Sequence, residues 1–241
     1  MTVDATHTIG VVGSGIMAAG IAEVAARGGI RAIVRARSES SAAAALKQIT
    51  GGLARQVDKG KLEASERDRI LANISTTVEL TGLADCDIVI ESVVEDLATK
   101  QQLFGELDAI VKPSAILATN TSTLSVVEMA KVTNRPDKVC GIHFFNPAAV
   151  LPLVEIVRPI TASDETIARA AAFVTSIGKE GVHVLDRAGF IVNALLFPYL
   201  NNAIRMLEDG TASMQDIDTA MKGGCNFPMG PLRLDWKYLP K

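Results

Sequence analysis

Aromatic residues and an excess of basic charge are both missing from this 241-residue sequence. Phe, Trp and Tyr make up only 4% of the chain, so we expect a core of Ala, Val, Ile and Leu. The formal net charge of −3 argues against a nucleic-acid partner, because no basic excess is present to displace counterions from phosphates. The three cysteines, Cys86, Cys140 and Cys225, form no CxxC pair, and we expect reduced thiols in a cytoplasmic protein.

Long apolar runs are missing as well. No segment approaches the roughly 18 apolar residues that span a bilayer, so no membrane partner is expected. The N-terminal sequence MTVDATH has neither the basic start nor the apolar run of a secretory signal peptide. Both absences agree with a cytoplasmic protein.

Short apolar segments alternate with helical patterns along the first three quarters of the chain. Because the segments are apolar almost throughout, they indicate a parallel sheet covered on both faces. Their order predicts an α/β fold, with a doubly wound Rossmann-type domain over residues 1–187. Residues 38–73 are expected to form a helical hairpin that turns at Lys59–Gly60. The predicted strands are 8–12, 32–35, 87–91, 115–119, 138–143, 154–158 and 182–185.

Residues 188–241 predict a small all-α C-terminal domain. GFIVNALLFPYLNNAIRML is apolar on nearly every side, which is typical of a helix buried all round, and Pro198 should kink it or mark a tight contact. A second, short helix should run from Ser213 to a stop at Gly223–Gly224. Fifty-four residues are too few to bury the first helix, so we expect it to pack on the first domain or in a homodimer.

The segment VVGSGIMAAG has the spacing of a dinucleotide-binding turn. Gly13 would make the tight turn, Gly15 would let a pyrophosphate approach the backbone, and Ala18 fills the third, small position. The turn follows the first predicted strand and opens a helix, whose N-terminus favours an anion. We therefore predict cofactor contacts from Gly13, Ser14, Gly15, Ile16 and Met17.

Polar or small residues follow five of the predicted strands, where a parallel sheet binds its ligands. Among them His143 is suited to exchange a proton near neutral pH, and Glu155 on the next strand could fix its tautomer. The Ser122 hydroxyl could bond a substrate oxygen. A core histidine and a helix-capping serine are the alternative interpretations. No metal site is predicted.

Six segments together resemble the L-3-hydroxyacyl-CoA dehydrogenase family, most closely its short 3-hydroxybutyryl-CoA type. The resemblance covers residues 9–234, and the GIHFFNP and AGFIVN motifs carry most of its specificity. The segments are IGVVGSGIMAAGIA, VIESVVEDLATKQQLF, ATNTSTL, GIHFFNPAAVLPLVEIV, DRAGFIVNALLFPYL and PMGPLRL.

The resemblance implies an oxidoreductase that interconverts (S)-3-hydroxyacyl-CoA and 3-oxoacyl-CoA. His143 would be the base, Glu155 would orient it, and Ser122 and Asn193 would bind the reacting oxygen. Lys59 matches a lysine that reaches the CoA phosphates, although Gly52 stands where a serine is often found. The positions that match cofactor contacts are Glu95, Lys100, Asn120 and Asn146.

The C-terminus departs from the family pattern. The family continues past PMGPLRL with further helices, whereas this sequence has only the seven residues Asp235–Lys241. We therefore expect a truncated second domain.

The second predicted strand departs from the pattern too. It ends IVRARSES, and Ala36 takes the place of the acidic residue that usually holds the adenosine ribose. Arg35 and Arg37 add positive charge, Arg37 being favoured because alternate residues on a strand share a face. Since Arg37 and Ser38 could bind a 2′-phosphate, we predict NADP or NAD as the cofactor, with NADP favoured. The alternative interpretation is that both arginines are only solvated residues at the end of an edge segment.

Two other functions remain open at this stage. A β-hydroxyacid dehydrogenase shares the GxGxM turn but uses a lysine at the reacting position, which His143 and Glu155 argue against. A catalytically silent nucleotide-binding or structural homologue would keep the fold without the activity.

Overall fold

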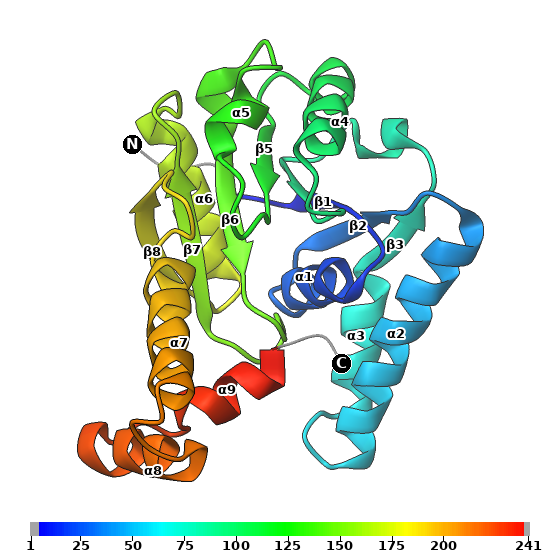
Figure 1. Ribbon diagram of the computed structural model, residues 1–241. Coiled ribbons are helices and arrows are strands. Elements are labelled where there is room, and N and C mark those ends of the chain that lie inside the picture. Colours follow the sequence, from blue (N-terminus) through cyan, green and yellow to red (C-terminus); the bar gives the residue numbers. More distant parts are fainter. Residues whose placement is uncertain (1–4, 239–241) are drawn as a thin grey trace. The chain divides into compact units, whose positions relative to one another are not determined.

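A computed structural model describes residues 5–238 of the chain, with side chains described up to Leu234. Eight strands form one sheet in the order β3-β2-β1-β4-β5-β6-β7-β8 (Figure 1). The strands are β1 (Thr8–Val12), β2 (Arg31–Arg35), β3 (Ile74–Thr77), β4 (Ile88–Glu91), β5 (Ile116–Thr119), β6 (Val139–Phe144), β7 (Leu153–Arg158) and β8 (Glu180–Leu185).

Strands β1 to β6 are all parallel, which confirms the predicted doubly wound fold. The sequence pattern missed two features of the sheet. Strand β3 is a short edge strand of sequence ISTT, whose polar residues hid it. Strand β7 runs antiparallel to β6 and pairs in parallel with β8, so this end of the sheet is reversed.

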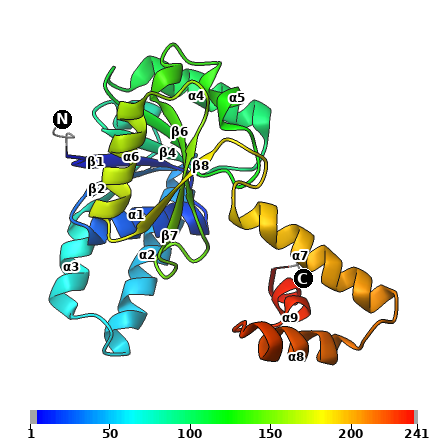
Figure 2. The same cartoon turned by 90° about the vertical axis from the view of Figure 1, so that its left-hand side faces the viewer.

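Helices cover both faces of the sheet. One face packs on α1 (Ile16–Arg27), α2 (Glu39–Asp58), α3 (Ala64–Ala72) and α6 (Asp164–Ser176). The other face packs on α4 (Leu97–Ile110) and α5 (Val126–Ala130). Figure 1 shows α4 and α5 above the strands and α1 below them, and Figure 2 shows α6 on the side of α1. The buried side chains are almost all aliphatic, as the scarcity of aromatics predicts.

Local sequence signals set the helix ends on this sheet. Ser38 caps α2 by accepting a hydrogen bond from the Ser41 N–H, and the Ser41 side chain completes the capping box. The predicted hairpin is present, because α2 ends at Asp58 and Gly60 takes a left-handed φ of 63° before α3 begins. The Ser38 cap therefore sets the start of the helix that follows the carboxyl end of β2.

The chain divides into two compact units, Met1–Phe190 and Ile191–Lys241, three residues beyond the predicted boundary at residue 187. The second unit contains α7 (Val192–Glu208), α8 (Met214–Cys225) and α9 (Pro231–Tyr238). Helix α8 begins after the predicted cap Ser213 but runs through both glycines, ending before Asn226 in a left-handed conformation. The predicted stop at Gly223–Gly224 is therefore wrong by one residue.

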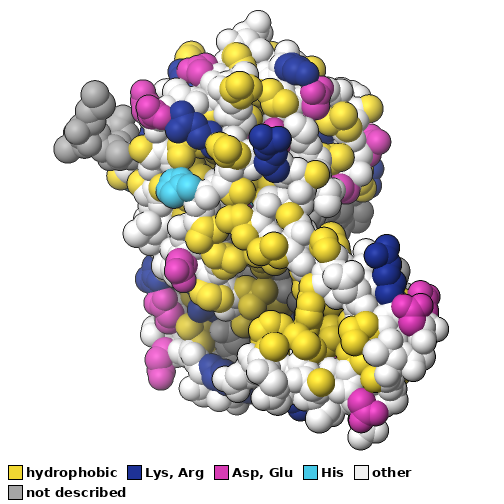
Figure 3. All heavy atoms as spheres, turned by 60° about the vertical axis from the view of Figure 1, so that its left-hand side comes forward, with side chains coloured by type: hydrophobic (Ala, Val, Ile, Leu, Met, Phe, Trp, Pro, Cys, Tyr) yellow, Lys and Arg dark blue, Asp and Glu magenta, His cyan; other side chains and the backbone are white. Residues whose placement is uncertain are grey.

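Helix α7 leaves much of its apolar surface exposed within the single chain, as expected of a helix that the 54 residues of its domain are too few to bury. Only Leu200 and Ala203 are buried, whereas Leu195 is 71% exposed and Phe197 52% exposed. The helix continues through Pro198. Figure 3 shows hydrophobic side chains gathered at the surface of the molecule. Among residues 5–238, no helix is both long and apolar enough to cross a membrane.

Candidate active site

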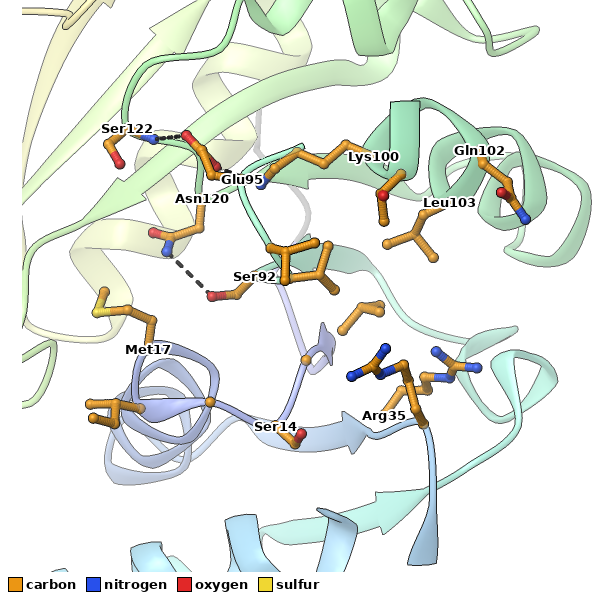
Figure 4. A pocket seen from close by; sticks show the side chains of 18 of the residues that line it. Ser14, Met17, Arg35, Ser92, Glu95, Lys100, Gln102, Leu103, Asn120 and Ser122 are labelled. Atoms are coloured by element: carbon orange, nitrogen blue, oxygen red, sulfur yellow. Dashed lines mark hydrogen bonds and ion pairs between the residues drawn. The ribbon is translucent and has the colours of Figure 1, made fainter. Parts of the chain in front are cut away.

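A pocket of about 890 Å³ lies at the carboxyl ends of the parallel strands (Figure 4). Its walls come from the Gly-rich turn after β1, from the ends of β2, β4 and β5, and from one side of α4. This is the sheet edge at which the strand-end residues predicted a cleft. The predicted lining residues that the pocket brings together are Gly13, Ser14, Gly15, Ile16, Met17, Arg37, Glu95, Lys100, Asn120 and Ser122.

The Gly-rich turn fits the phosphates of a dinucleotide. Gly13 has a φ of 137°, and a Cβ there would collide with the carbonyl oxygen of Ser92. Above Gly15 a Cβ would meet nothing within 4 Å, so an anion could approach the backbone closely. Gly15 is also the N-cap of α1, and no side chain caps this helix. The first turn of α1 can therefore donate its N–H groups to a pyrophosphate.

The end of β2 presents two arginines to the same pocket. Arg35 and Arg37 both line it, whereas Ala36 is only 1% exposed and donates its N–H to the Thr77 carbonyl. The Nε atom of Arg35 donates to the carbonyl of Val78 at 3.2 Å. Ala36 itself is buried and does not line the pocket, whereas its two neighbours line it and supply the charge.

The imidazole of His143 and the carboxylate of Glu155 form a buried pair. Register in the sheet places them directly opposite each other on β6 and β7, and Nδ1 of His143 lies 2.7 Å from Oε2 of Glu155. Glu155 is fully buried and His143 only 5% exposed. With a carboxylate as the acceptor, the bond requires the proton on Nδ1, and the neutral tautomer with that proton has its lone pair on Nε2. This is the arrangement of a histidine base held by an orienting carboxylate.

Two phenylalanine rings hold the imidazole of His143. The ring of Phe145 lies 4.5 Å from it, centroid to centroid, and that of Phe190 lies 5.5 Å away, edge to face. Phe190 is buried and has a φ of 50°, a left-handed conformation that is strained for an aromatic residue. The packing of these rings fixes the plane of the imidazole.

Asn120 links the pocket to the end of β6. Its Oδ1 atom accepts the backbone N–H of Phe144 at 2.8 Å, and its Nδ2 atom donates to Oγ of Ser92 at 3.4 Å (Figure 4). The residue next to His143 is therefore tied to the turn that lines the pocket.

Comparison with known proteins identifies the family. The profile described as 3-hydroxyacyl-CoA dehydrogenase, NAD binding domain, matches residues 8–187, and that of the C-terminal domain matches residues 189–235. A 3-hydroxybutyryl-CoA dehydrogenase from Mycobacterium tuberculosis is 47% identical over 96% of this chain and 82% of that protein. The chain belongs to the 3-hydroxyacyl-CoA dehydrogenase family.

Solved structures of relatives have the same fold. The crystal structure of M. tuberculosis FadB2 superposes with a TM-score of 0.93 at 47% identity, covering 96% of this chain and 82% of that one. The (S)-3-hydroxybutyryl-CoA dehydrogenase PaaH1 from Ralstonia eutropha gives a TM-score of 0.93 at 37% identity, covering 95% and 81%. Membership of the 3-hydroxyacyl-CoA dehydrogenase family disfavours the β-hydroxyacid dehydrogenase alternative and implies a nicotinamide cofactor.

Six predicted site residues do not line the pocket. Three of them are buried, namely His143, Glu155 and Ala36, and the other three lie elsewhere on the chain. Asn146 is exposed on the loop after β6, Lys59 is exposed at the end of α2, and Asn193 is the second residue of α7 in the second unit. Their roles stay predictions. Among the described residues, no group of His, Cys, Asp and Glu side chains is arranged to hold a metal ion.

Sequence reasoning counted Glu91 and Thr121 only among the polar residues at the strand ends, without a role, and it missed Phe190. Glu91 reads as the last residue of an apolar strand, Thr121 as a turn residue and Phe190 as part of a helix. In the structure Glu91 is fully buried, Thr121 is 1% exposed and Phe190 packs on His143. A carboxylate inside an otherwise apolar strand was the one available signal, because such a group is buried only with partners.

Proposed function

We propose that this chain interconverts (S)-3-hydroxyacyl-CoA and 3-oxoacyl-CoA thioesters, with 3-hydroxybutyryl-CoA as the expected substrate. The observation that carries the proposal is the buried His143–Glu155 pair at the strand ends beside a pocket that fits a dinucleotide. The M. tuberculosis and Bacillus subtilis relatives named as established or probable 3-hydroxybutyryl-CoA dehydrogenases support the substrate class, at 47% and 42% identity.

The side chains would divide the proton chemistry as follows. Nε2 of His143 takes the proton of the 3-hydroxyl group in oxidation and returns it in reduction. Glu155 stabilises the imidazolium that forms, since it accepts from Nδ1 at 2.7 Å. The hydroxyl of Ser122 and the amide of Asn193 donate to the reacting oxygen, where negative charge develops. A bound nicotinamide supplies the hydride acceptor or donor.

The thioester would reach the site by its acyl end, with the CoA phosphates recognised elsewhere. Lys59 caps the end of α2 with an exposed ammonium group, which is suited to a phosphate. Gly52, about two turns before Lys59 on the same side of α2, carries no hydroxyl, and a Cβ there would meet Oε2 of Glu23 at 3.9 Å and Nη2 of Arg55 at 4.0 Å. We expect a weaker hold on CoA than a serine at that position would give.

An absorbance assay tests the proposed function directly. The purified chain is mixed with acetoacetyl-CoA and reduced nicotinamide cofactor, and loss of absorbance at the nicotinamide band is followed. Turnover that depends on both reactants supports the proposal. No turnover, with cofactor still bound, supports the catalytically silent alternative.

The cofactor is proposed to be NADP(H) in preference to NAD(H). Ala36, the first residue after β2, offers no carboxylate to bond the ribose hydroxyls or repel a 2′-phosphate, and the nearest acidic side chain is Glu39 in the first turn of α2. Arg37 is exposed at the pocket wall, Arg35 lies beside it, and three serines surround the start of α2. Guanidinium and hydroxyl donors at a helix N-terminus suit a phosphate. Two arginines beside an alanine in place of a carboxylate are the observation that favours this choice.

The protein is proposed to form a homodimer through its second unit. Leu195 and Phe197 on α7, with Met214 and Phe227 beyond it, leave large apolar side chains more than two-fifths exposed. Apolar surface of this kind marks an interface in soluble proteins. A second copy offers the same apolar helix, and a two-fold axis would bury both.

A further inference from the structure

The loop that carries Ser122 is held by one carboxylate. Oε1 of Glu95 accepts the hydroxyl of Thr121, the N–H of Ser122 at 3.0 Å and the N–H of Thr123 at 3.3 Å. Three successive residues of the β5–α5 loop therefore converge on one oxygen atom. The position of this oxygen atom therefore determines the position of the Ser122 backbone.

The other oxygen of Glu95 is held by Lys100. The ammonium Nζ lies 3.0 Å from Oε2 of Glu95, and 2.7 and 2.8 Å from the two oxygens of Glu91. Lys100 is 1% exposed and Glu91 fully buried. An ammonium group has three N–H donors, and these three oxygens account for all of them. Figure 4 shows Glu95 between Lys100 and Ser122.

Glu91 is in turn fixed by the sheet. It also accepts the hydroxyl of Thr119 at 2.8 Å and the N–H of Val93 at 2.7 Å. Thr119 is its direct neighbour on β5. A rigid strand pair therefore positions Glu91, Glu91 positions Lys100, and Lys100 turns Glu95 toward the loop.

Glu95 is ionised in this arrangement. Burial of its carboxyl raises the pKa, but the hydrogen bond from Thr121 and the charge of Lys100 outweigh burial and hold the pKa below its ordinary value. A charged acceptor makes stronger hydrogen bonds to the loop than a neutral one.

We propose that Lys100 is a positioning residue that sets the place of the Ser122 hydroxyl through Glu95, rather than a residue that binds the cofactor through its ammonium group. The ammonium has its donors committed to two carboxylates, whereas Glu95 is partly exposed to the pocket and bonded to the serine loop. The inference rests on the proposed dehydrogenase function for its kinetic consequence. The contacts among Glu91, Lys100, Glu95 and the loop 121–123, which we call the clamp, do not depend on that function.

The test replaces Lys100 by Met and separates kcat from cofactor affinity. Misplacement of a reacting group by about 1 Å costs up to about 10²-fold, so we expect kcat of Lys100→Met to fall by about 10- to 100-fold. The Kd of the reduced cofactor, measured by its fluorescence, should change less than about threefold on this geometry. A large rise in Kd with kcat preserved at saturating cofactor would overturn the proposal.

A double-mutant cycle shows whether Lys100 acts through the serine. In a Ser122→Ala background, Lys100→Met should lower kcat little further, because the hydroxyl it positions is already gone. Losses that multiply in the double variant would mean that Lys100 acts by another route. Lys112→Met is the matched control, since Lys112 pairs with Asp87 just before β4, at the opposite end of the same strand. It should keep the kcat of the wild type.

Amide hydrogen exchange tests the positioning of the loop without requiring enzyme turnover. Amide hydrogen exchange of residues 121–123 should become faster in Lys100→Met and stay unchanged in Lys112→Met. If Lys100→Met does not fold, Thr121→Val removes the hydroxyl from Glu95 and should give the same fall in kcat and the same faster exchange. Unchanged exchange in both variants contradicts the clamp. A wild-type protein inactive on acetoacetyl-CoA, with the exchange results as expected, contradicts the proposed function alone.

Discussion

The ring of Phe190 meets the imidazole of His143 edge to face, with centroids 5.5 Å apart, although Phe190 is the last residue of the first unit. Its φ of 50° places the backbone in a conformation that costs roughly 1 kcal/mol or more for a residue with a Cβ. Packing against the core and against His143 offsets that cost. The last residue of the first unit therefore also packs directly against the imidazole of the candidate base, His143.

Replacing Phe190 tests this contact. Phe190→Ala should lower the free energy of unfolding by about 3–5 kcal/mol, because a buried aromatic ring is lost. It should also lower kcat more than it raises KM, since His143 loses one of the two rings that orient it. Phe190→Leu should keep most of both properties. Urea unfolding and steady-state kinetics on the three proteins check the prediction; an Ala variant with unchanged kcat contradicts it.

The base itself gives the largest expected effect. His143→Gln should lower kcat by about 10²–10⁴-fold, because the proton acceptor is lost, while the cofactor remains bound. Glu155→Gln should have a smaller effect in the same direction, since the amide no longer stabilises the imidazolium. Stopped-flow or steady-state assays with acetoacetyl-CoA measure kcat, and cofactor fluorescence measures binding. Near-normal turnover by His143→Gln would remove this residue from the mechanism.

Cofactor preference depends on the end of β2. We expect kcat/KM with NADPH to exceed that with NADH, and Ala36→Asp to reverse the ratio by restoring a carboxylate. Arg37→Gln should lower kcat/KM with NADPH and leave kcat/KM with NADH nearly unchanged. Because Ala36 is buried, Arg37→Gln is the cleaner variant, and Ser14→Ala at the pyrophosphate end serves as its control. A wild type that prefers NADH contradicts the proposal.

Acid should weaken the protein through Asp108. Burial raises the pKa of this carboxyl, but hydrogen bonds from Asn134 at 2.8 Å and Arg135 at 2.6 Å outweigh it and hold the pKa below its ordinary value. Its contribution is therefore fully present above the unfolded-state pKa near about 3.9 and is lost as pH falls through the lower folded-state value.

The matching variant is Asp108→Asn. It should lose roughly 1–3 kcal/mol of unfolding free energy at neutral pH, because Arg135 loses its charged partner, and the difference from wild type should shrink below pH of about 4. Asp68→Asn is the control, since its pair with Arg67 is exposed and should change stability by less than about 0.5 kcal/mol. Urea titrations between neutral and acid pH give both values.

The oligomeric state tests the apolar surface of α7. We expect light scattering to give a dimer at micromolar concentration and Leu195→Glu to give a monomer with unchanged helix content. A charge on a residue that is 71% exposed in one chain is harmless there but costly in an interface. A wild-type monomer contradicts the dimer.

The strands, the Gly-rich turn and the candidate pair His143–Glu155 could be predicted from the sequence, because each has a signal in a short stretch of residues. Apolar runs marked seven of the eight strands, and the GxGxxA spacing marked the phosphate turn. Strand β3 escaped because ISTT has one apolar residue, and β7 gave no sign of its direction. The Glu91–Lys100–Glu95 clamp could not be predicted, because whether Lys100 reaches both carboxylates depends on how α4 packs against the end of β4. The excess apolar surface of α7 could be predicted from the length of its domain, but not what covers that surface, since composition does not tell which apolar faces have partners.

The register of β6 and β7 has a consequence for how such a protein can diverge. His143 and Glu155 face each other through the backbone ladder, so their separation does not depend on residues 146–152, which join the two strands beyond Phe145. Insertions or substitutions in that connection are therefore expected to leave the separation of the two side chains unchanged. The proposed acid–base pair can be kept while the chain between its two strands changes in length or sequence.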